Sequence, residues 1–585
     1  MYTRRIHSAT TRALGIPEVM GLICGSSCLS QSDLANLCQV SRFMSDISMP
    51  PLWRHVTAEV LLELICSASV CSRSNGTIRS IILDEHSIDD QTFAKFHLYA
   101  PYVRTLDIYS GKHNRCYTVH GWDILRDEME AQGHPLLPNL KTLRFLNISH
   151  SYGLDELKWI SMFATRGVNE VSISPNRLSA EGLIAFSIAS TILKTLVDLC
   201  PSIQTLDIST GDFSMPLFPE DDRLRTAFAH RPTRRWYQEL ELLTQLRYLT
   251  VSDGWLCPDS LLALSNLPEL EFLCIVPGSL DGFLIFDMDP ILPTGVFPHL
   301  AELSILGSDG YDTETILSVV EMSRKITVMR LELELCSEDG VDDTWRELEK
   351  TFGGLRNASC LRELHVTFPI QPEEGERPMN AYDSIEKMGP HLSLEHIHIS
   401  GIRINRDHCF IRKLAALWPN VRTLSMPSQS ASLKELEEFA RLPSLRHLTV
   451  NLSLKYPDYV TRPDFERRPL KTLKSSGPVR LSTSYKDLSL SANALLVLWP
   501  SLERVSWSDE DPTRTQMADF FNSEVLRFNR EFLFREPRDV AQLSATKRAK
   551  EMRSLFRLVK EGLEEVDSDS DADADTDPEE GSGTE

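Results

Sequence analysis

The sequence predicts an α/β fold with four parts: a small N-terminal helical module, a long solenoid of short repeats, a helical C-terminal cap and a disordered acidic tail. Three observations support this prediction. A short apolar pattern recurs along most of the 585 residues. Apolar residues at helical spacing lie on both sides of that array, and the final stretch is acidic sequence of low complexity.

The recurring pattern is Pro-x-Φ-x-x-Φ-x-Φ, where Φ is an apolar residue. Fourteen copies occur, mostly 24 to 43 residues apart, which is a repeat period. Eight copies begin with Pro, and their second Φ residues are Leu106, Leu143, Leu206, Leu273, Leu303, Leu424, Leu448 and Val505. Six copies lack the Pro and centre on Ile81, Val171, Leu249, Met329, Leu364 and Ile397.

Each copy predicts a strand, and the sequence ahead of many copies predicts a helix. The Φ-x-Φ ending alternates as a short strand does. An apolar stretch of helical spacing precedes it, as in residues 411–418, and the Pro ends that helix. One such unit cannot bury its own apolar face, but stacked neighbours can. We therefore expect a solenoid over residues 76–510. A different α/β fold with one parallel sheet is the alternative at this level.

This array resembles the leucine-rich repeat family, in the irregular form that follows an F-box in many fungal proteins. It departs from the regular Leu-x-x-Leu-x-Leu-x-x-Asn/Cys pattern, because the Asn/Cys position is filled irregularly and the spacing varies. The resemblance implies a solenoid with insertions and uneven curvature.

The segment 13–55 has motifs in a fixed order. They are Ile16-Pro17-Glu18, then Leu29–Leu34 (LSQSDL), then Val40–Phe43 (VSRF), then Pro51-Leu52-Trp53. Pro17 suits the first turn of a helix. Ser30 and Asp33 have the spacing of a capping box at the start of a second helix.

These four blocks resemble the F-box family. The resemblance implies a three-helix module that docks on the Skp-type adaptor of a cullin–RING ubiquitin ligase. The residues that match the apolar anchors of the family are Ile16, Pro17, Leu34, Val40, Phe43, Leu52 and Trp53. The departures are Ile16 in place of Leu and the turn at 25–28. The alternative is a helical hairpin without a docking role.

The remaining segments complete the expected organisation. Residues 1–12 should be flexible, and 56–75 should form a linking helix. Helical periodicity returns over 511–566, which fits an end cap for the array. Residues 567–585 are acidic and should be disordered.

Composition excludes several functional classes. The net charge is −22, and half of it lies in Glu564–Glu585, so the chain offers little to a nucleic-acid backbone. We expect no nucleic-acid partner, no membrane span and no secretory signal. The cysteines show no zinc-site spacing, and no metal or cofactor is expected. We also find no motif of catalytic chemistry, so the chain is expected not to be an enzyme, although a site assembled only in space would escape this search.

A target-binding surface is expected on the concave face of the solenoid. The residue between the last two Φ positions points there, since strand side chains alternate. The resulting row is Asp107, Arg144, Ser172, Asp207, Thr250, Cys274, Ser304, Arg330, His365, His398, Ser425, Thr449 and Ser506. From it we select Asp107, Arg144, Asp207, Arg330, His365 and His398 as candidate target contacts.

The function expected from these features is that of a substrate-recognition subunit of an SCF-type ligase, cytoplasmic or nuclear. Its F-box would bind the adaptor and, through it, cullin, while the solenoid would hold a protein target. The alternative is an F-box and repeat scaffold with no role in ubiquitination. The two alternatives share every sequence feature.

Overall fold

The computed structural model describes residues 16–527 apart from a set of gaps. The gaps are residues 27, 66–67, 73–77, 84–90, 110–115, 148–152, 174–183, 212–236, 257, 278–291, 334–340, 369–380, 403–408, 455–468, 478, 482–484 and 508–518. The segment 1–12, the tail 567–585 and most of the expected cap therefore lie outside the described residues.

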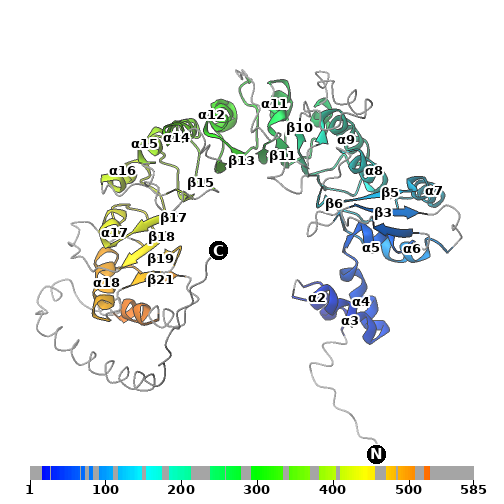
Figure 1. Ribbon diagram of the computed structural model, residues 1–585, viewed down its shortest axis with the longest axis horizontal. Helices are drawn as coiled ribbons and strands as arrows, with labels where there is room; N and C mark the ends of the chain where they lie inside the picture. The colour runs from blue at the N-terminus through cyan, green and yellow to red at the C-terminus, as the bar shows by residue number, and fades with distance from the viewer. Residues whose placement is uncertain are drawn as a thin grey trace, which may run out of the picture.

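The chain forms an arch whose inner side is one long parallel sheet and whose outer side carries helices (Figure 1). The strands follow one another in sequence order along the arch, and every neighbouring pair is parallel. They are β1 (His55–Thr57), β4 (Thr105–Ile108), β6 (Thr142–Phe145), β7 (Glu170–Ser172), β9 (Thr205–Ile208), β11 (Tyr248–Ser252), β12 (Phe272–Val276), β13 (Glu302–Ser308), β14 (Val328–Leu333), β15 (Glu363–Thr367), β16 (His396–Ser400), β17 (Thr423–Ala431), β18 (His447–Leu454), β19 (Thr472–Ser475) and β21 (Arg504–Trp507).

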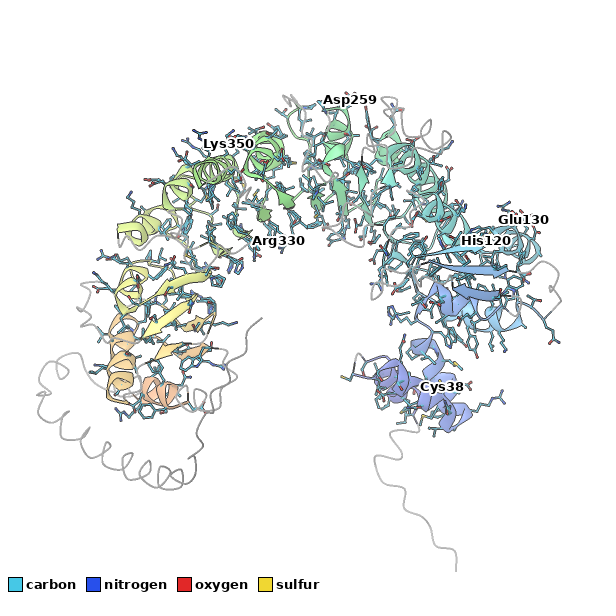
Figure 2. All side chains as sticks on the ribbon, viewed as in Figure 1. Cys38, His120, Glu130, Asp259, Arg330 and Lys350 are labelled. Atoms are coloured by element: carbon cyan, nitrogen blue, oxygen red, sulfur yellow. The ribbon has the colours of Figure 1, made fainter. Side chains whose placement is uncertain are left out.

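Helices connect these strands on the convex side. The α-helices are α5 (Ala58–Leu62), α6 (Ala94–Tyr99), α7 (Trp122–Gln132), α8 (Leu154–Phe163), α9 (Phe186–Leu199), α11 (Pro258–Ser265), α12 (Gly310–Ser318), α13 (Val320–Ser323), α14 (Val341–Leu355), α15 (Tyr382–Lys387), α16 (Cys409–Leu417), α17 (Leu433–Phe439) and α18 (Tyr485–Leu498). The 3₁₀ helices are η2 (Ala100–Tyr102), η4 (Gln238–Leu242) and η5 (Asp253–Trp255). Lys350 of α14 lies on this outer side, and Arg330 of β14 on the inner side (Figure 2).

One apolar residue from each strand stacks on its neighbours through the whole arch. We call this set the leucine ladder. It consists of Val56, Leu106, Leu143, Val171, Leu206, Leu249, Leu273, Leu303, Met329, Leu364, Ile397, Leu424, Leu448, Leu473 and Val505. All of them are buried in a single continuous core. The repeat prediction is thus confirmed at thirteen of its fourteen copies.

The backbone stacks in the same way at the amino end of every strand. The residue two positions before each ladder residue offers its carbonyl oxygen to the next repeat, which donates two N–H groups to it. Thr327 O, for example, accepts from Arg362 N at 2.8 Å and from Glu363 N at 3.0 Å, and Arg362 O then accepts from Glu395 N and His396 N. This carbonyl ladder runs from Arg54 to Lys471 and fixes the register of the repeats.

The start of the array differs from the prediction. The expected linking helix over 56–75 is wrong: β1 already belongs to the main sheet, α5 has five residues, and β2 (Ala68–Ser72) follows it. The copy at Ile81 is also not a ladder strand. It lies in β3 (Ile78–Leu83), which pairs antiparallel with β2 and parallel with β5 (Cys116–His120) in a separate sheet. The alternation correctly predicted a strand at Ile81, but this strand pairs with β2 and β5 and not with the strands of the main sheet.

Two further small pairings accompany the main sheet. β20 (Arg480–Leu481) pairs with β18, and β8 (Ile184–Ala185) pairs with β10 (Thr210–Gly211). At the far end, a helix at 519–527 packs on the last repeat. Phe521 and Val525 are buried there, Phe521 lies 6.1 Å from Trp507 between ring centroids, and the Asn522 side chain accepts the N–H of Val505 at 3.0 Å. This helix therefore covers part of the end of the sheet.

Before β1 the chain forms three short helices: α2 (Pro17–Cys24), α3 (Gln31–Val40) and α4 (Arg42–Leu52). The capping box between Ser30 and Asp33 is present, and its hydrogen bonds lower the pKa of the Asp33 carboxyl. The three helices share a core that is separate from the leucine ladder. It holds Met20, Cys24 and Leu34, with Leu29, Leu37, Met44, Ile47 and Leu52 packed around them.

The leucine ladder yields a direct prediction. Leu364→Ala removes a fully buried side chain between Met329 and Ile397 and should lower the free energy of unfolding by about 2–5 kcal/mol. Urea denaturation followed by circular dichroism measures this change. Leu392→Ala is the matched control: Leu392 is 68 % exposed, and its loss should change stability by about 0.5 kcal/mol or less. Equal midpoints for the two variants would contradict the packing described.

Candidate protein-binding surfaces

Two rows of side chains face the hollow of the arch, one on each side of the leucine ladder. The first, which we call the inner row, follows each ladder residue. It is the row expected from sequence, and strand register confirms its alignment across the sheet. The structure adds Thr57 at its start and Lys474 near its end.

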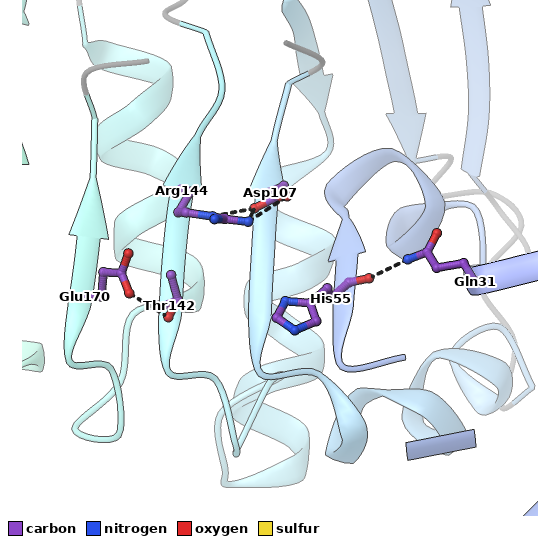
Figure 3. A network of polar contacts seen from close by, with 6 residues as sticks. All are labelled: Gln31, His55, Asp107, Thr142, Arg144 and Glu170. Atoms are coloured by element: carbon purple, nitrogen blue, oxygen red, sulfur yellow. Dashed lines mark hydrogen bonds and ion pairs between the residues drawn. The ribbon is translucent and has the colours of Figure 1, made fainter. Parts of the chain in front are cut away.

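At the N-terminal end of the inner row, two expected contacts pair with each other. Arg144 donates from Nε to Asp107 Oδ1 at 2.9 Å and from its terminal nitrogen to Asp107 Oδ2 at 3.1 Å (Figure 3). At the positions that precede the ladder residues, Thr142 of β6 donates to Glu170 of β7 at 3.2 Å. Because the Arg144 and Asp107 charges offset each other, this region is a polar surface of little net charge.

The centre of the inner row is buried. Asp207 is 8 % exposed and accepts a hydrogen bond from Ser172 at 3.0 Å, and Thr250, Cys274 and Ser304 are also buried. Asp207 therefore offers little exposed surface to a binding partner. Sequence alternation placed it on the correct face of the strand but could not reveal its burial.

The C-terminal half carries a connected polar cluster over β13 to β17. Arg330 forms an ion pair with Glu302 and lies 4.0 Å from Glu363, which pairs with His365 at 2.7 Å. The rings of His365 and His398 lie 5.7 Å apart, and His398 Nδ1 lies 2.9 Å from Ser425 Oγ. The structure thus brings Arg330, His365 and His398 together, as neighbours on adjacent strands.

The surroundings of His398 disfavour its charged form. Burial, and secondly the neighbouring His365, lower the pKa of His398 below its ordinary value of 6.5. The cluster is therefore a hydrogen-bonding surface with a neutral imidazole at its centre near neutral pH.

A second exposed row went unnoticed in the sequence. It precedes each ladder residue and so faces the same side, by the same alternation. Tyr248, His396 and His447 of this row are exposed, and the Tyr248 ring lies 6.2 Å from that of Phe272. The residue type at the position before the ladder residue varies from copy to copy. The alternation of side chains along a strand would have placed this row on the concave face.

The three N-terminal helices present the other candidate surface. Ile16, Leu22, Ile23, Val40 and Phe43 are exposed large apolar residues, with Leu22 at 78 % and Val40 at 69 %. Single exposed apolar residues are ordinary, whereas several on one small module make that module a candidate interaction surface. Leu22 and Ile23 were not expected here. The sequence could have indicated their exposure, because the apolar residues of α2 spread over more of the helix surface than one buried face can cover.

The other residues expected at this surface have different positions. Pro17 is exposed at the start of α2, Leu34 is buried in the three-helix core, and Leu52 packs against that core. Trp53 is partly buried against the solenoid core, where it stacks on Tyr99 at 4.3 Å between ring centroids. The Gln31 side chain also donates a 3.3 Å hydrogen bond to the His55 carbonyl oxygen (Figure 3). This bond and the stack both join the three helices to the solenoid.

No metal centre is found among the described residues, since no three His, Cys, Asp or Glu side chains are grouped to hold an ion. His391, which lies near His396 and His398 in sequence, is buried elsewhere, and burial lowers its pKa. Within the same residues no helix has the length and apolar character to cross a membrane.

Comparisons with known proteins give distant likenesses only. No family model and no curated protein matches the chain. Among solved structures, it resembles an internalin (InlF) from Listeria monocytogenes at 12 % identity and a TM-score of 0.28, over 82 % of this chain and 94 % of that one. It also resembles TLR13 in its complex with ssRNA13, at 12 % identity and a TM-score of 0.34, over 72 % of this chain and 58 % of that one.

Both are leucine-rich-repeat proteins. At these values the solenoid architecture rests on the strand order and register of the chain itself. The F-box resemblance stays a prediction from the sequence motifs.

The lowered pKa of His398 predicts how stability depends on pH. Below pH 6.5 the folded chain binds fewer protons at this residue than the unfolded chain, so stability falls as pH drops through 6.5 towards the folded pKa. His398→Gln should therefore lose less stability between pH 7.5 and 5.5 than the parent chain, measured by urea midpoints.

The matched control is His396→Gln, an exposed residue of the same strand and face. His55 and His391, whose pKa values burial also lowers, are present in every chain compared, so only the difference counts. Equal pH dependence in the His398→Gln and His396→Gln chains would refute the assignment.

Proposed function

We propose that this protein is the substrate-recognition subunit of an SCF-type cullin–RING ubiquitin ligase and is not itself catalytic. Its three N-terminal helices dock on the Skp-type adaptor, and its solenoid holds a protein target on the concave face. Rate enhancement then comes from holding the target close to the ubiquitin-loaded enzyme. The protein works in the cytoplasm, the nucleus or both, where such complexes act.

The observation that carries the proposal is the exposed apolar set on α2 to α4. These helices have their own core, so Val40 and Phe43 are not needed to hold them together and remain available to a partner. The order of the sequence motifs supplies the family of that partner. The solenoid supports the other half of the proposal, because a curved parallel sheet presents a broad surface suited to protein targets.

Adaptor binding is tested with Val40→Asp and Phe43→Asp in one chain. Burying each of these side chains contributes about 1.5–3 kcal/mol, so the double variant should bind a purified Skp-type adaptor at least about 100-fold more weakly. The control is Leu242→Asp with Val320→Asp, two exposed apolar residues far along the arch. Both chains should keep the melting temperature of the parent. Adaptor binding unaffected by the first pair would end the F-box assignment.

The role in ubiquitination needs a separate measurement, because a scaffold that binds the adaptor without joining an active ligase has the same features. Mass spectrometry of proteins recovered with the parent chain should find adaptor and cullin together. Recovery of the adaptor without cullin would favour the scaffold.

Target capture by the concave face is tested with Arg330→Glu and His365→Glu. Proteins retained by both the parent and the Val40→Asp/Phe43→Asp chain are target candidates. The Arg330→Glu/His365→Glu chain should no longer retain these proteins but should still bind the adaptor. Asp107→Asn with Arg144→Gln, at the neutralised end of the row, is the matched control for position. Targets retained by the Arg330→Glu/His365→Glu chain would exclude this cluster as the capture site.

A further inference from the structure

The carbonyl ladder places one side chain from every repeat along the rim at the amino ends of the strands. Because the backbone of these residues is fixed by paired hydrogen bonds, their side chains form a regular row with the spacing of strands, about 4.8 Å. We call this set the amino rim. Over β15 to β21 it consists of Arg362, Glu395, Arg422, Arg446, Lys471 and Glu503.

This part of the amino rim is basic in a protein of strongly negative net charge. Arg422 pairs with Glu395 at 2.9 Å and Lys471 with Glu503 at 3.3 Å. Arg362 and Arg446 are exposed, and their guanidinium groups have no ion pair among the described residues. Within the described part of the chain, these two regularly placed cations therefore have no ion-pair partner.

A groove runs along the same rim. One cavity of about 350 Å³ is lined by Arg362, Leu392, Ser393, Glu395, Asn420, Arg422 and Ser444. A second, of about 590 Å³, shares Arg362 and Ser393 and extends past Thr327 and Ala301 to Pro298. Ala301 and Thr327 are short side chains at rim positions where neighbouring repeats carry Arg or Glu, and this difference opens the groove.

The chain contains a segment of opposite charge. Residues 567–577 (DSDSDADADTD) have Asp at every second position, with only Ser, Ala or Thr between. In an extended chain, side chains two residues apart point to the same side, so the six carboxylates would form a single anionic face. They would span about 33 Å, against about 19 Å from Arg362 to Lys471.

We propose that the acidic segment 567–577 binds along the amino rim in an extended conformation, with its carboxylates on Arg362, Arg446 and their basic neighbours. The segment thereby occupies the groove of its own chain. This inference is independent of adaptor docking and of target capture on the concave face.

The connection is long enough. From the last strand, β21, to β15 is about 24 Å at normal strand spacing. Between the helix at 519–527 and the segment lie residues 528–566. A flexible chain of that length has an end-to-end distance of about 31–37 Å, and a fully helical one about 58 Å, so either conformation reaches the groove.

The test uses a fluorescent peptide of the sequence 567–577 and full-length chains. In one chain, all six Asp of 567–577 are changed to Asn, which removes the charge of the internal competitor. Fluorescence anisotropy should show that this chain binds the peptide, with an affinity that falls as salt rises. The parent chain should bind it at least about tenfold more weakly, because its own segment competes at high effective concentration.

Charge reversal locates the site. In the six-Asn chain, Arg362→Glu with Arg446→Glu should weaken peptide binding at least about tenfold. The matched control is Arg54→Glu with Arg104→Glu, which makes the same charge change in the same row at the opposite end of the arch. Unchanged melting temperatures would show that all of these chains are folded.

Three results would overturn the proposal. The six-Asn chain could fail to bind the peptide, or both charge-reversed pairs could weaken binding equally, which would indicate attraction to net charge alone. Equal binding by the parent and six-Asn chains would show that the segment does not occupy its own rim, and acidic peptides of other proteins would then be the ligands of the groove.

Discussion

The leucine ladder is the interaction on which the remaining structure depends. Each ladder residue touches its equivalents in the repeats before and after, so no repeat has a core of its own. The carbonyl ladder fixes the same register through the backbone, two hydrogen bonds at each step. The two ladders together make the arch a single stacked body, and they determine where every other side chain lies.

Both candidate surfaces of the solenoid follow from this constraint. Each ladder residue points into the core, away from the hollow of the arch. The positions on either side of it must therefore face the hollow, where Arg330, His365 and His398 form one connected cluster. The amino rim arises from the same register at the end of each strand. Surface chemistry can therefore vary from repeat to repeat while the core and its register are maintained. The mixed charge in the C-terminal half of the concave face and the burial at the centre of the inner row both result from this variation between repeats.

Much of the fold could be predicted from the sequence because its determinants are local and repeated. The spacing of apolar residues identified thirteen ladder positions, and the side of the strand followed from parity. Val56 was missed although Pro51 stands five residues before it, as Pro does in eight of the other copies, because Pro51-Leu52-Trp53 was assigned to the F-box-like motif instead. Ile81 was misplaced because alternation identifies a strand but not its partner. The burial of Asp207 and the packing of Trp53 on Tyr99 depend on residues distant in the chain. The local pattern carries no information about either, so the candidate sites were predicted less completely than the fold.

The joint between Trp53 and His55 has a consequence for how such a protein can change over evolution. The three helices have a separate core, and the contacts that join them to the solenoid include the Trp53–Tyr99 stack and the hydrogen bond from Gln31 to His55. A recombination event at this joint would exchange the three-helix module and leave both cores whole. Within the array, a break between repeats would expose a bare strand edge and one end of the leucine ladder. Such genes should therefore shuffle their N-terminal module freely and gain or lose repeats only as whole units.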